Sequence, residues 1–243
     1  MKEQLPLKID FDRGCSLENF FEAGNQAALR KLRLLISEYS SYYMLWLCAA
    51  HGAGKSHLAQ ALCAEYEARG KVVIYIAFQE LVDFISAGGY DPLWVDSLTS
   101  ADLLCFDDLE LLDDLPTDQK AYLEEQLFGL INQNLLNQHQ CLVFTSVQLP
   151  HQLNLVLKDL LSRLDLFEIL KLQAFDEEQS LAFIQFKAKK VGLELEEKVA
   201  EFLLKRVARD PGSLSKVIDK LDRFSLATTR KLTIPAVKEA LSL

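Results

Sequence analysis

Five short apolar runs, each next to a segment with helical spacing, fill the chain as far as residue 172. The runs are rich in Leu, Val, Ile and aromatic residues, as expected for strands buried on both faces of a parallel sheet. The predicted strands are 43–48, 71–77, 101–106, 140–146 and 166–172. The predicted helices are 16–38, 55–68, 81–85, 117–138 and 157–164. This alternation predicts an α/β fold with a parallel sheet and right-handed crossovers.

The pattern changes at Asp176, after which only helical spacing appears. The predicted helices of this part are 176–190, 195–208, 211–225 and 234–242. Asp210-Pro211 provides a cap followed by a proline that suits a first helical turn. The sequence therefore predicts an extended arm over 1–14, an α/β domain over 15–174 and a small all-helical domain over 175–243.

The segment Ala49–Ser56, between the first predicted strand and the next helix, has the composition of a phosphate-binding loop. Small residues let backbone N–H groups approach a phosphate, a lysine supplies positive charge, and a serine hydroxyl suits Mg²⁺. The full G-x-x-x-x-G-K-[ST] signature starts with glycine, and here Ala49 stands first. The alternative is a glycine-containing turn with a surface lysine. The residues expected to bind the nucleotide are His51, Gly52, Ala53, Gly54, Lys55, Ser56 and His57.

Asp107 and Asp108 follow the third predicted strand in a Walker B pattern. Since the carboxyl ends of parallel strands lie beside a phosphate loop, Asp107 is expected to join Ser56 around a nucleotide-bound Mg²⁺. Asp108 is expected to orient water. At the end of the fourth strand, Thr145 is expected to reach the γ-phosphate or its water. The alternative for the acidic pair is a solvated turn.

Composition and charge indicate which partners, metal sites and cellular compartment to expect. A net charge of −9 disfavours broad direct contact with nucleic acid, so protein partners are expected. The five cysteines form no C-x-x-C pair and the four histidines lack metal-ligand spacing, so we expect reduced core thiols and no zinc site. No run of 18 uncharged apolar residues and no signal-peptide core occur, which predicts a cytoplasmic protein without membrane association.

The arm over 1–14 contains Pro6 and alternates apolar and polar residues, which indicates extended chain. Its Gln4, Leu5, Leu7 and Ile9 are spaced so that an extended peptide places them in the pockets of a partner protein. An edge strand packed on its own domain explains this pattern equally well.

Four stretches resemble the Hda family, the DnaA-related AAA+ regulators of bacterial replication initiation. They are Gly54–Leu58, Pro150–Leu155, Leu161–Asp165 and Arg230–Lys238. The last two are long and uncommon, and the resemblance covers essentially the whole chain. It implies an AAA+ fold, in which a P-loop parallel sheet is sandwiched by helices and followed by a helical lid.

The resemblance also implies ligands and partners. Hda proteins bind ADP, with Mg²⁺ held through the nucleotide, and dock on the sliding clamp of DNA polymerase III through an N-terminal Q-L-x-L-x-L peptide. That arrangement falls on Gln4, Leu5, Leu7 and Ile9. In the ADP state, with the clamp on DNA, the family promotes hydrolysis of the ATP held by DnaA. The chain ends at Leu243 without the DNA-reading domain of DnaA, so DNA is expected to be reached only through the clamp.

An arginine finger is implied at Arg163, within the stretch Ser162-Arg163. A guanidinium group placed against a transferring phosphoryl group offsets the charge that develops in the transition state. From the residues alone, the alternative is an internal salt bridge with Asp159 or Asp165, which lie at helical or near-helical spacing.

Two positions depart from DnaA-type domains. Val147 stands where those domains carry an acid after the fourth strand, and Gly212 stands where they carry an arginine near the start of the third lid helix. Arg209 and Lys216 flank Gly212 but are offset by several positions. Both missing groups would contact the γ-phosphate or its water. We therefore predict a site that holds ADP at least as well as ATP and hydrolyses ATP weakly.

Together these features predict a regulator that converts ATP–DnaA to ADP–DnaA with the loaded clamp and so prevents re-initiation of replication. A homodimer would strengthen its weak clamp peptides. The alternatives are a DnaA-like AAA+ helicase loader and a non-enzymatic adaptor that tethers DnaA to the clamp. Phe20 and Phe21 precede the helix where this family cradles adenine, although such aromatic pairs are more often core residues.

Overall fold

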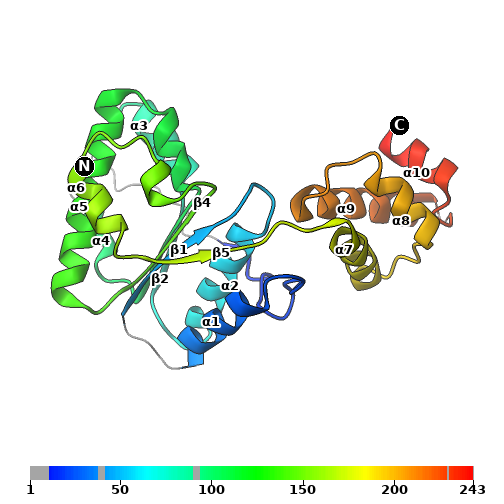
Figure 1. Ribbon diagram of the computed structural model, residues 1–243, viewed down its shortest axis with the longest axis horizontal. Helices are drawn as coiled ribbons and strands as arrows, with labels where there is room; N and C mark the ends of the chain where they lie inside the picture. The colour runs from blue at the N-terminus through cyan, green and yellow to red at the C-terminus, as the bar shows by residue number, and fades with distance from the viewer. Residues whose placement is uncertain (1–10, 38–41, 90–93, 229, 243) are drawn as a thin grey trace. The chain divides into compact units, whose positions relative to one another are not determined.

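The computed structural model describes residues 11–37, 42–89, 94–228 and 230–242. They form two compact units, drawn in Figure 1. The N-terminal unit contains 11–20, 26–49 and 55–172, and the C-terminal unit contains 21–25, 50–54 and 173–242. The chain thus changes units after residue 172, and part of the predicted phosphate loop packs with the helical unit. The predicted clamp peptide, Gln4, Leu5, Leu7 and Ile9, lies outside the described residues.

The N-terminal unit is built on a parallel five-stranded sheet with the order β2-β3-β4-β1-β5. Its strands are β1 Tyr43–Cys48, β2 Val73–Ala77, β3 Leu103–Asp107, β4 Cys141–Ser146 and β5 Glu168–Lys171. The predicted α/β class and all five strands are confirmed. Because β1, β3 and β4 are neighbours, the chain segments that follow their carboxyl ends meet at one edge of the sheet.

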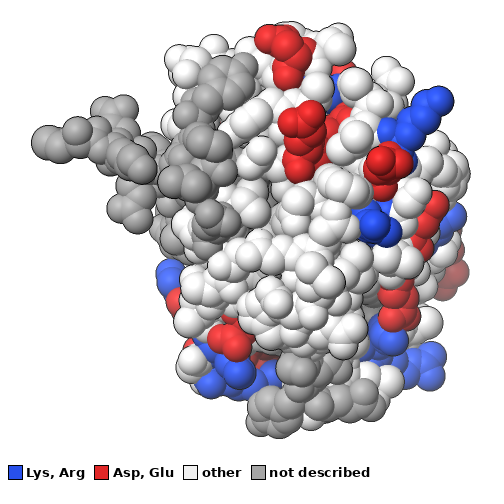
Figure 2. Space-filling model, turned by 90° about the vertical axis from the view of Figure 1, so that its left-hand side faces the viewer, with Lys and Arg blue, Asp and Glu red and all other residues white. Residues whose placement is uncertain are grey.

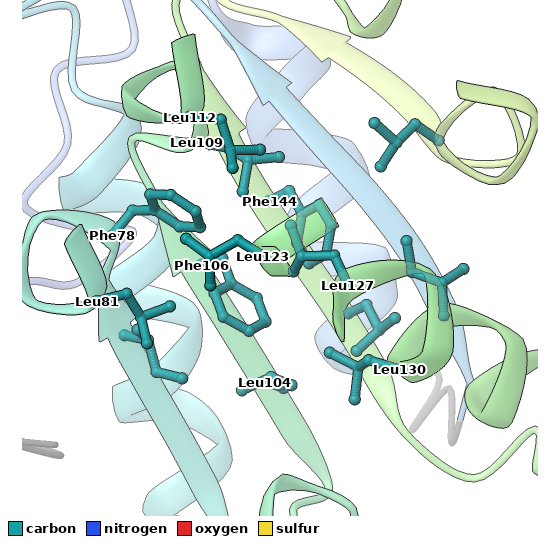
Figure 3. Close-up of a cluster of buried hydrophobic side chains, with 14 of the residues drawn as sticks. Phe78, Leu81, Leu104, Phe106, Leu109, Leu112, Leu123, Leu127, Leu130 and Phe144 are labelled. Atoms are coloured by element: carbon teal, nitrogen blue, oxygen red, sulfur yellow. The ribbon is translucent and has the colours of Figure 1, made fainter. Parts of the chain in front are cut away.

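Helices cover both faces of this sheet. They are α1 Gln26–Ser37, α2 Lys55–Glu67, α3 Phe78–Ser86, α4 Trp94–Leu98, α5 Thr117–Asn137 and α6 Lys158–Leu164, with 3₁₀ turns at η1 Leu109–Asp114 and η2 Pro150–Gln152. Side chains alternate between the faces, so Phe106 and Phe144 meet α3 and α5 on one side (Figure 3). On the other side, Cys105 lies 3.4 Å from Cys63 of α2.

The predicted helix over 16–38 is wrong in its first part, because α1 begins only at Gln26. The Ser16 hydroxyl accepts a hydrogen bond from the Asn19 N–H at 3.1 Å, as a helix cap would. Yet it closes a single turn, and Gly24 then adopts a left-handed backbone with φ of 74°. A cap motif therefore marked a local turn and not the start of a long helix.

The C-terminal unit is all helical, as predicted. It contains α7 Glu177–Lys190, α8 Glu197–Leu204, α9 Pro211–Thr228 and α10 Ile234–Leu241. Their apolar faces enclose a core of their own that includes Ile184, Leu203, Leu214, Ile218 and Val237. Asp176 caps α7 by accepting from Gln179 N–H, and Thr233 caps α10 by accepting from Ala236 N–H.

All five cysteines are free thiols, and four of them are buried as predicted for core residues, whereas Cys15 is partly exposed. Burial raises the pKa of the Cys141 thiol to about 11. Across the described ranges, no cluster of three or more His, Cys, Asp or Glu side chains is arranged to hold a metal ion. No helix in the same part of the chain is long and apolar enough to span a membrane.

Candidate functional site

Lys55 is the first residue of α2 and only 4% of its surface is exposed. Its ammonium group donates to the Ala49 carbonyl oxygen at 3.2 Å and lies 3.8 Å from Asp108 Oδ1. A buried ammonium needs acceptors and an opposite charge, and this one has both. The alternative of a turn with a surface lysine is therefore wrong. Ser56 follows in the first turn of α2, whose N-terminal N–H groups favour a bound anion.

A network of hydroxyl groups holds the two acidic residues after β3. Asp107 is 5% exposed and accepts hydrogen bonds from Tyr75 Oη at 2.6 Å and from Thr145 Oγ1. The Thr145 hydroxyl in turn accepts from the Asp108 backbone N–H at 2.9 Å. Asp107 is thus not part of a solvated turn. Asp108 adopts a left-handed backbone, with φ of 64°, and its side chain remains 42% exposed beside Lys55.

This network changes the interpretation of Thr145. Its hydroxyl is fully buried and both donates and accepts within the protein, so it positions the Asp107 carboxylate and the Asp108 backbone. Tyr75, on the neighbouring strand β2, was not anticipated from the sequence. Burial and the nearby Asp107 charge raise the pKa of the Tyr75 hydroxyl far above its usual value, so the hydroxyl stays protonated and donates to Asp107.

A second buried carboxylate lies at the end of β4. Glu110, in η1, is 8% exposed, and its Oε2 accepts from the Val147 backbone N–H at 3.2 Å. Its Oε1 has no hydrogen-bond partner within the described residues. Val147 stands where DnaA-type domains carry an acid. Its backbone N–H donates instead to the carboxylate of Glu110, which comes from η1. No local sequence signal marks this contact.

The loop residues 50–54 lie in the C-terminal unit and contact the start of α9. The Gly212 N–H donates to the Gly52 carbonyl oxygen at 2.9 Å. Gly52 and Gly54 have φ of 73° and 102°, values that favour glycine, as a phosphate-binding turn requires. Arg209, which flanks the position of the missing arginine, forms an ion pair with Glu177 at 3.1 Å.

The histidines and phenylalanines near the loop have different surroundings. His51 is exposed, whereas His57 Nε2 lies 2.9 Å from the Ser16 carbonyl oxygen and its ring lies 5.7 Å from that of Phe20. Phe20 is buried in the N-terminal unit. Phe21 packs in the C-terminal unit against Phe175, Phe183 and Phe186. Both phenylalanine rings are therefore packed within the protein, as expected if they are core residues.

Arg163 lies in the last turn of α6 and is half-buried. Its Nε donates to Asn132 Oδ1 at 2.6 Å, and its guanidinium lies over the Phe128 ring at 5.6 Å. Both partners belong to α5. Within the described residues Arg163 forms no ion pair with Asp159 or Asp165, so the predicted alternative of an internal salt bridge is wrong.

The start of α6 is fixed by the same helix. Glu124 of α5 is fully buried and its carboxylate accepts from the backbone N–H groups of Val156 and Leu157, just before α6. Asp113 accepts from Asn154 N–H at 3.1 Å and pairs with Lys120 at 2.6 Å. These contacts hold the segment that leads into α6, and with it the position of Arg163.

The charges on the N-terminal unit are mixed. On the face shown in Figure 2, Lys and Arg side chains do not form a continuous patch, and both signs surround a wide uncharged area. Nucleic-acid surfaces usually gather Lys and Arg on one face. This face therefore lacks the basic patch expected of a nucleic-acid surface.

Two family models match this chain, one over the α/β part and one over the helical part. The family model of the bacterial DnaA ATPase domain matches residues 11–169, and that of the Hda lid domain matches residues 176–241. Together they cover the sheet as far as the start of β5, the loop and carboxylate residues around Lys55, Arg163, and the four helices of the helical unit.

Solved structures agree in fold. AMPPCP-bound DnaA from Aquifex aeolicus is 26% identical with a TM-score of 0.73, over 95% of this chain and 71% of that one. A DNA replication initiation factor is 25% identical with a TM-score of 0.71, and this chain covers 66% of its length with 89% of its own. Domain III of Thermotoga maritima DnaA is 24% identical with a TM-score of 0.78, over 98% of both chains.

The sheet order, the loop before α2 and the acidic end of β3 are the features expected of an AAA+ domain, and the family match extends over most of the chain. The helical unit adds the second match. The chain therefore belongs to the bacterial DnaA ATPase-domain family and carries an Hda-type lid, the combination found in an Hda-like, DnaA-related replication regulator.

Proposed function

We propose that this protein, in its ADP-bound state and together with the DNA-loaded sliding clamp, stimulates ATP hydrolysis by DnaA and so prevents re-initiation of replication. The chemistry takes place on the nucleotide of DnaA, and this chain supplies Arg163 to it. The proposal rests on the family match and on the environment of Arg163.

The main observation behind the proposal is that residues of α5 support Arg163 from one side. Its polar contact within the described residues is through Nε, and the Phe128 ring supports the plane of the guanidinium. The two terminal NH₂ groups carry the donors that bind phosphate oxygens in pairs. A guanidinium held through Nε is therefore oriented while its terminal donors can serve a phosphoryl group on another protein.

The residues around Lys55 fit a nucleotide of this chain's own. The Lys55 ammonium and the glycine-rich turn over 50–54 would hold the β-phosphate, and Ser56 and Asp107 would face its Mg²⁺. When bound, Mg²⁺ neutralises phosphate charge. The buried Asp107 and the donors at the start of α2 suit this ligand. With Val147 and Gly212 at the two positions that contact a γ-phosphate in DnaA-type domains, we expect this nucleotide to be ADP and its hydrolysis to be weak.

The clamp peptide is the second part of the proposal. Gln4, Leu5, Leu7 and Ile9 match the Q-L-x-L-x-L arrangement of clamp-binding peptides in this family. The acidic balance of the chain supports indirect contact with DNA, since phosphate binding is driven by Lys and Arg. The clamp would bring this protein and DnaA together on DNA.

The central test is a hydrolysis assay with ATP–DnaA, clamp-loaded DNA, ADP and this protein. Replacing Arg163 with Ala should reduce the stimulated rate by roughly 10³-fold, because a finger contributes about that much. Arg163→Lys should restore little, since an ammonium lacks the planar pair of donors. Arg206→Ala is a matched control, because Arg206 also lies over a phenylalanine ring, at 5.0 Å from that of Phe202.

The same assay separates the alternatives. If Arg163→Ala retains full stimulation while DnaA and the clamp still bind, the chain is a tether and not a finger donor. Gln4→Ala should weaken clamp binding and stimulation together. Loss of clamp binding in Gln4→Ala without loss of activity would instead favour a helicase loader.

A further inference from the structure

The contact between the phosphate loop and α9 places an unexpected charge beside the loop. A Cβ atom built on Gly52 would lie 2.0 Å from Asp210 Oδ1 and 2.8 Å from its Cγ. The Asp210 carboxylate therefore rests directly against the Cα of Gly52. At this end of α9, the helical unit brings an anion to the loop where DnaA-type domains bring a cation.

Local structure fixes Asp210 in this position. Its Oδ1 accepts from the Ser213 N–H at 2.8 Å and its carbonyl oxygen accepts from the Leu214 N–H at 3.0 Å, so it caps the start of α9. The Gly212 N–H holds the Gly52 carbonyl oxygen. A Cβ on Gly212 would approach the Gly52 Cα to 3.1 Å, so a larger residue at 212 would require the Gly52 backbone to shift slightly.

The neighbouring cation does not offset this charge. Arg209 is bound to Glu177 at 3.1 Å, with both side chains largely exposed. The sequence around the position of the missing arginine thus combines a glycine that permits close approach, an acid in contact with the loop and an arginine turned to another partner.

We propose that Asp210 is a specificity-determining residue that makes the loop discriminate against a γ-phosphate and so favours a nucleoside diphosphate. This inference rests on the proposed function of the loop as a nucleotide site. Because loop N–H groups hold phosphates within hydrogen-bond distance, a carboxylate touching Gly52 lies within about 5–8 Å of them. A nucleoside triphosphate brings about one more negative charge than a diphosphate, so it meets more repulsion from Asp210.

The test compares affinities for ADP and for AMPPCP, each with Mg²⁺, in the full-length protein. Asp210→Asn removes the charge and keeps the cap, since Asn and Asp cap helices about equally well. It should tighten AMPPCP binding by roughly 3- to 10-fold more than ADP binding, and added salt should shrink that difference. Asp219→Asn, on the exposed side of the same helix, is the matched control and should leave the ratio unchanged.

The outcomes distinguish this inference from the proposal on which it rests. An unchanged AMPPCP-to-ADP ratio in Asp210→Asn, with ADP still bound, would overturn the role of Asp210 and leave the nucleotide site intact. Failure of the unmodified protein to bind either nucleotide would overturn the nucleotide site itself, and the inference with it. If Asp210→Asn does not fold, Asp210→Ser supplies a second neutral cap, and the same shift in ratio is expected.

Discussion

The Lys55 ammonium and the Arg163 guanidinium lie in contrasting environments of the same α/β unit. Lys55 is 4% exposed, at the end of the sheet, with a carbonyl oxygen and a carboxylate nearby. Arg163 is half-buried on the last turn of α6, supported from one side by Asn132 and Phe128. The first arrangement suits a site that retains its ligand. The second suits a group presented to another molecule.

The difference arises from where each residue lies in the fold. Loops at the carboxyl ends of parallel strands are enclosed by neighbouring strands and by the next helix, so Lys55, Asp107 and Thr145 are all buried. Arg163, in the last turn of a short helix, is instead supported by Asn132 and Phe128 of α5. Substitutions should therefore change one site without changing the other.

After Arg163→Ala itself, the largest expected effect is at the enclosed site. Lys55→Ala should weaken ADP binding by about 100-fold, since it removes a charge-assisted bond to phosphate. Titration calorimetry measures this affinity. Lys71→Ala, which breaks an exposed ion pair with Asp102, is the control and should bind ADP normally. Equal affinity in Lys55→Ala would remove the loop from the nucleotide site.

A smaller effect is expected at the presented site. Asn132→Ala removes the acceptor that orients Arg163, so stimulation of DnaA hydrolysis should fall by about tenfold, as for a misplaced catalytic group. ADP affinity should not change. Asn137→Ala, at the exposed end of the same helix, should leave both quantities as they were. If Asn132→Ala lowers ADP affinity as well, the two sites are not separate.

Stability offers a third comparison. Tyr75→Phe removes a donor to the buried Asp107 carboxylate and should lower the free energy of unfolding by about 1–2 kcal/mol in urea titration. The Thr145 hydroxyl still donates to Asp107, which limits the loss. Tyr42→Phe, at a half-buried tyrosine, should cost less. A neutral Tyr75→Phe would show that Thr145 alone holds Asp107.

The smallest effect concerns pH. Burial raises the pKa of Cys141 from 9.0 to about 11, so the folded state keeps a proton that the unfolded state releases. The stabilising contribution is therefore complete below pH 9 and is lost as pH rises toward 11. Between pH 7.5 and 9.5 the free energy of unfolding should fall by roughly 0.5–1 kcal/mol from this thiol. Cys141→Ala should flatten that part of the profile.

Much of the fold was predictable because buried parallel strands leave continuous apolar runs. The five strands were predicted to within a few residues, as were the lid helices. The five-residue helix α4 and the 3₁₀ turn η1 were not predicted, because segments so short show no periodicity. The helix predicted from residue 16 failed because capping is a local event, and Ser16 completed its hydrogen bond within one turn.

The site was predictable only where its residues are neighbours in sequence. The loop lysine and the acidic pair have motif spacing, so Lys55, Asp107 and Asp108 were singled out. Tyr75 and Glu110 are brought in by strand register and by the turn after β3, neither of which has a local signature. For the same reason Asn132, which is far from Arg163 along the chain, was missed in favour of nearby acids.

Contacts from α5 set the length required of the segment between β4 and α6. Glu124 holds the backbone of Val156 and Leu157, and Asn132 holds Arg163, so one helix fixes both the entry to α6 and its final turn. Each residue added to or removed from a helix rotates the later residues about its axis by about 100°. One extra residue after Leu157 would carry the guanidinium around α6 and away from Asn132. The spacing of this segment is therefore as important for the proposed finger as the arginine.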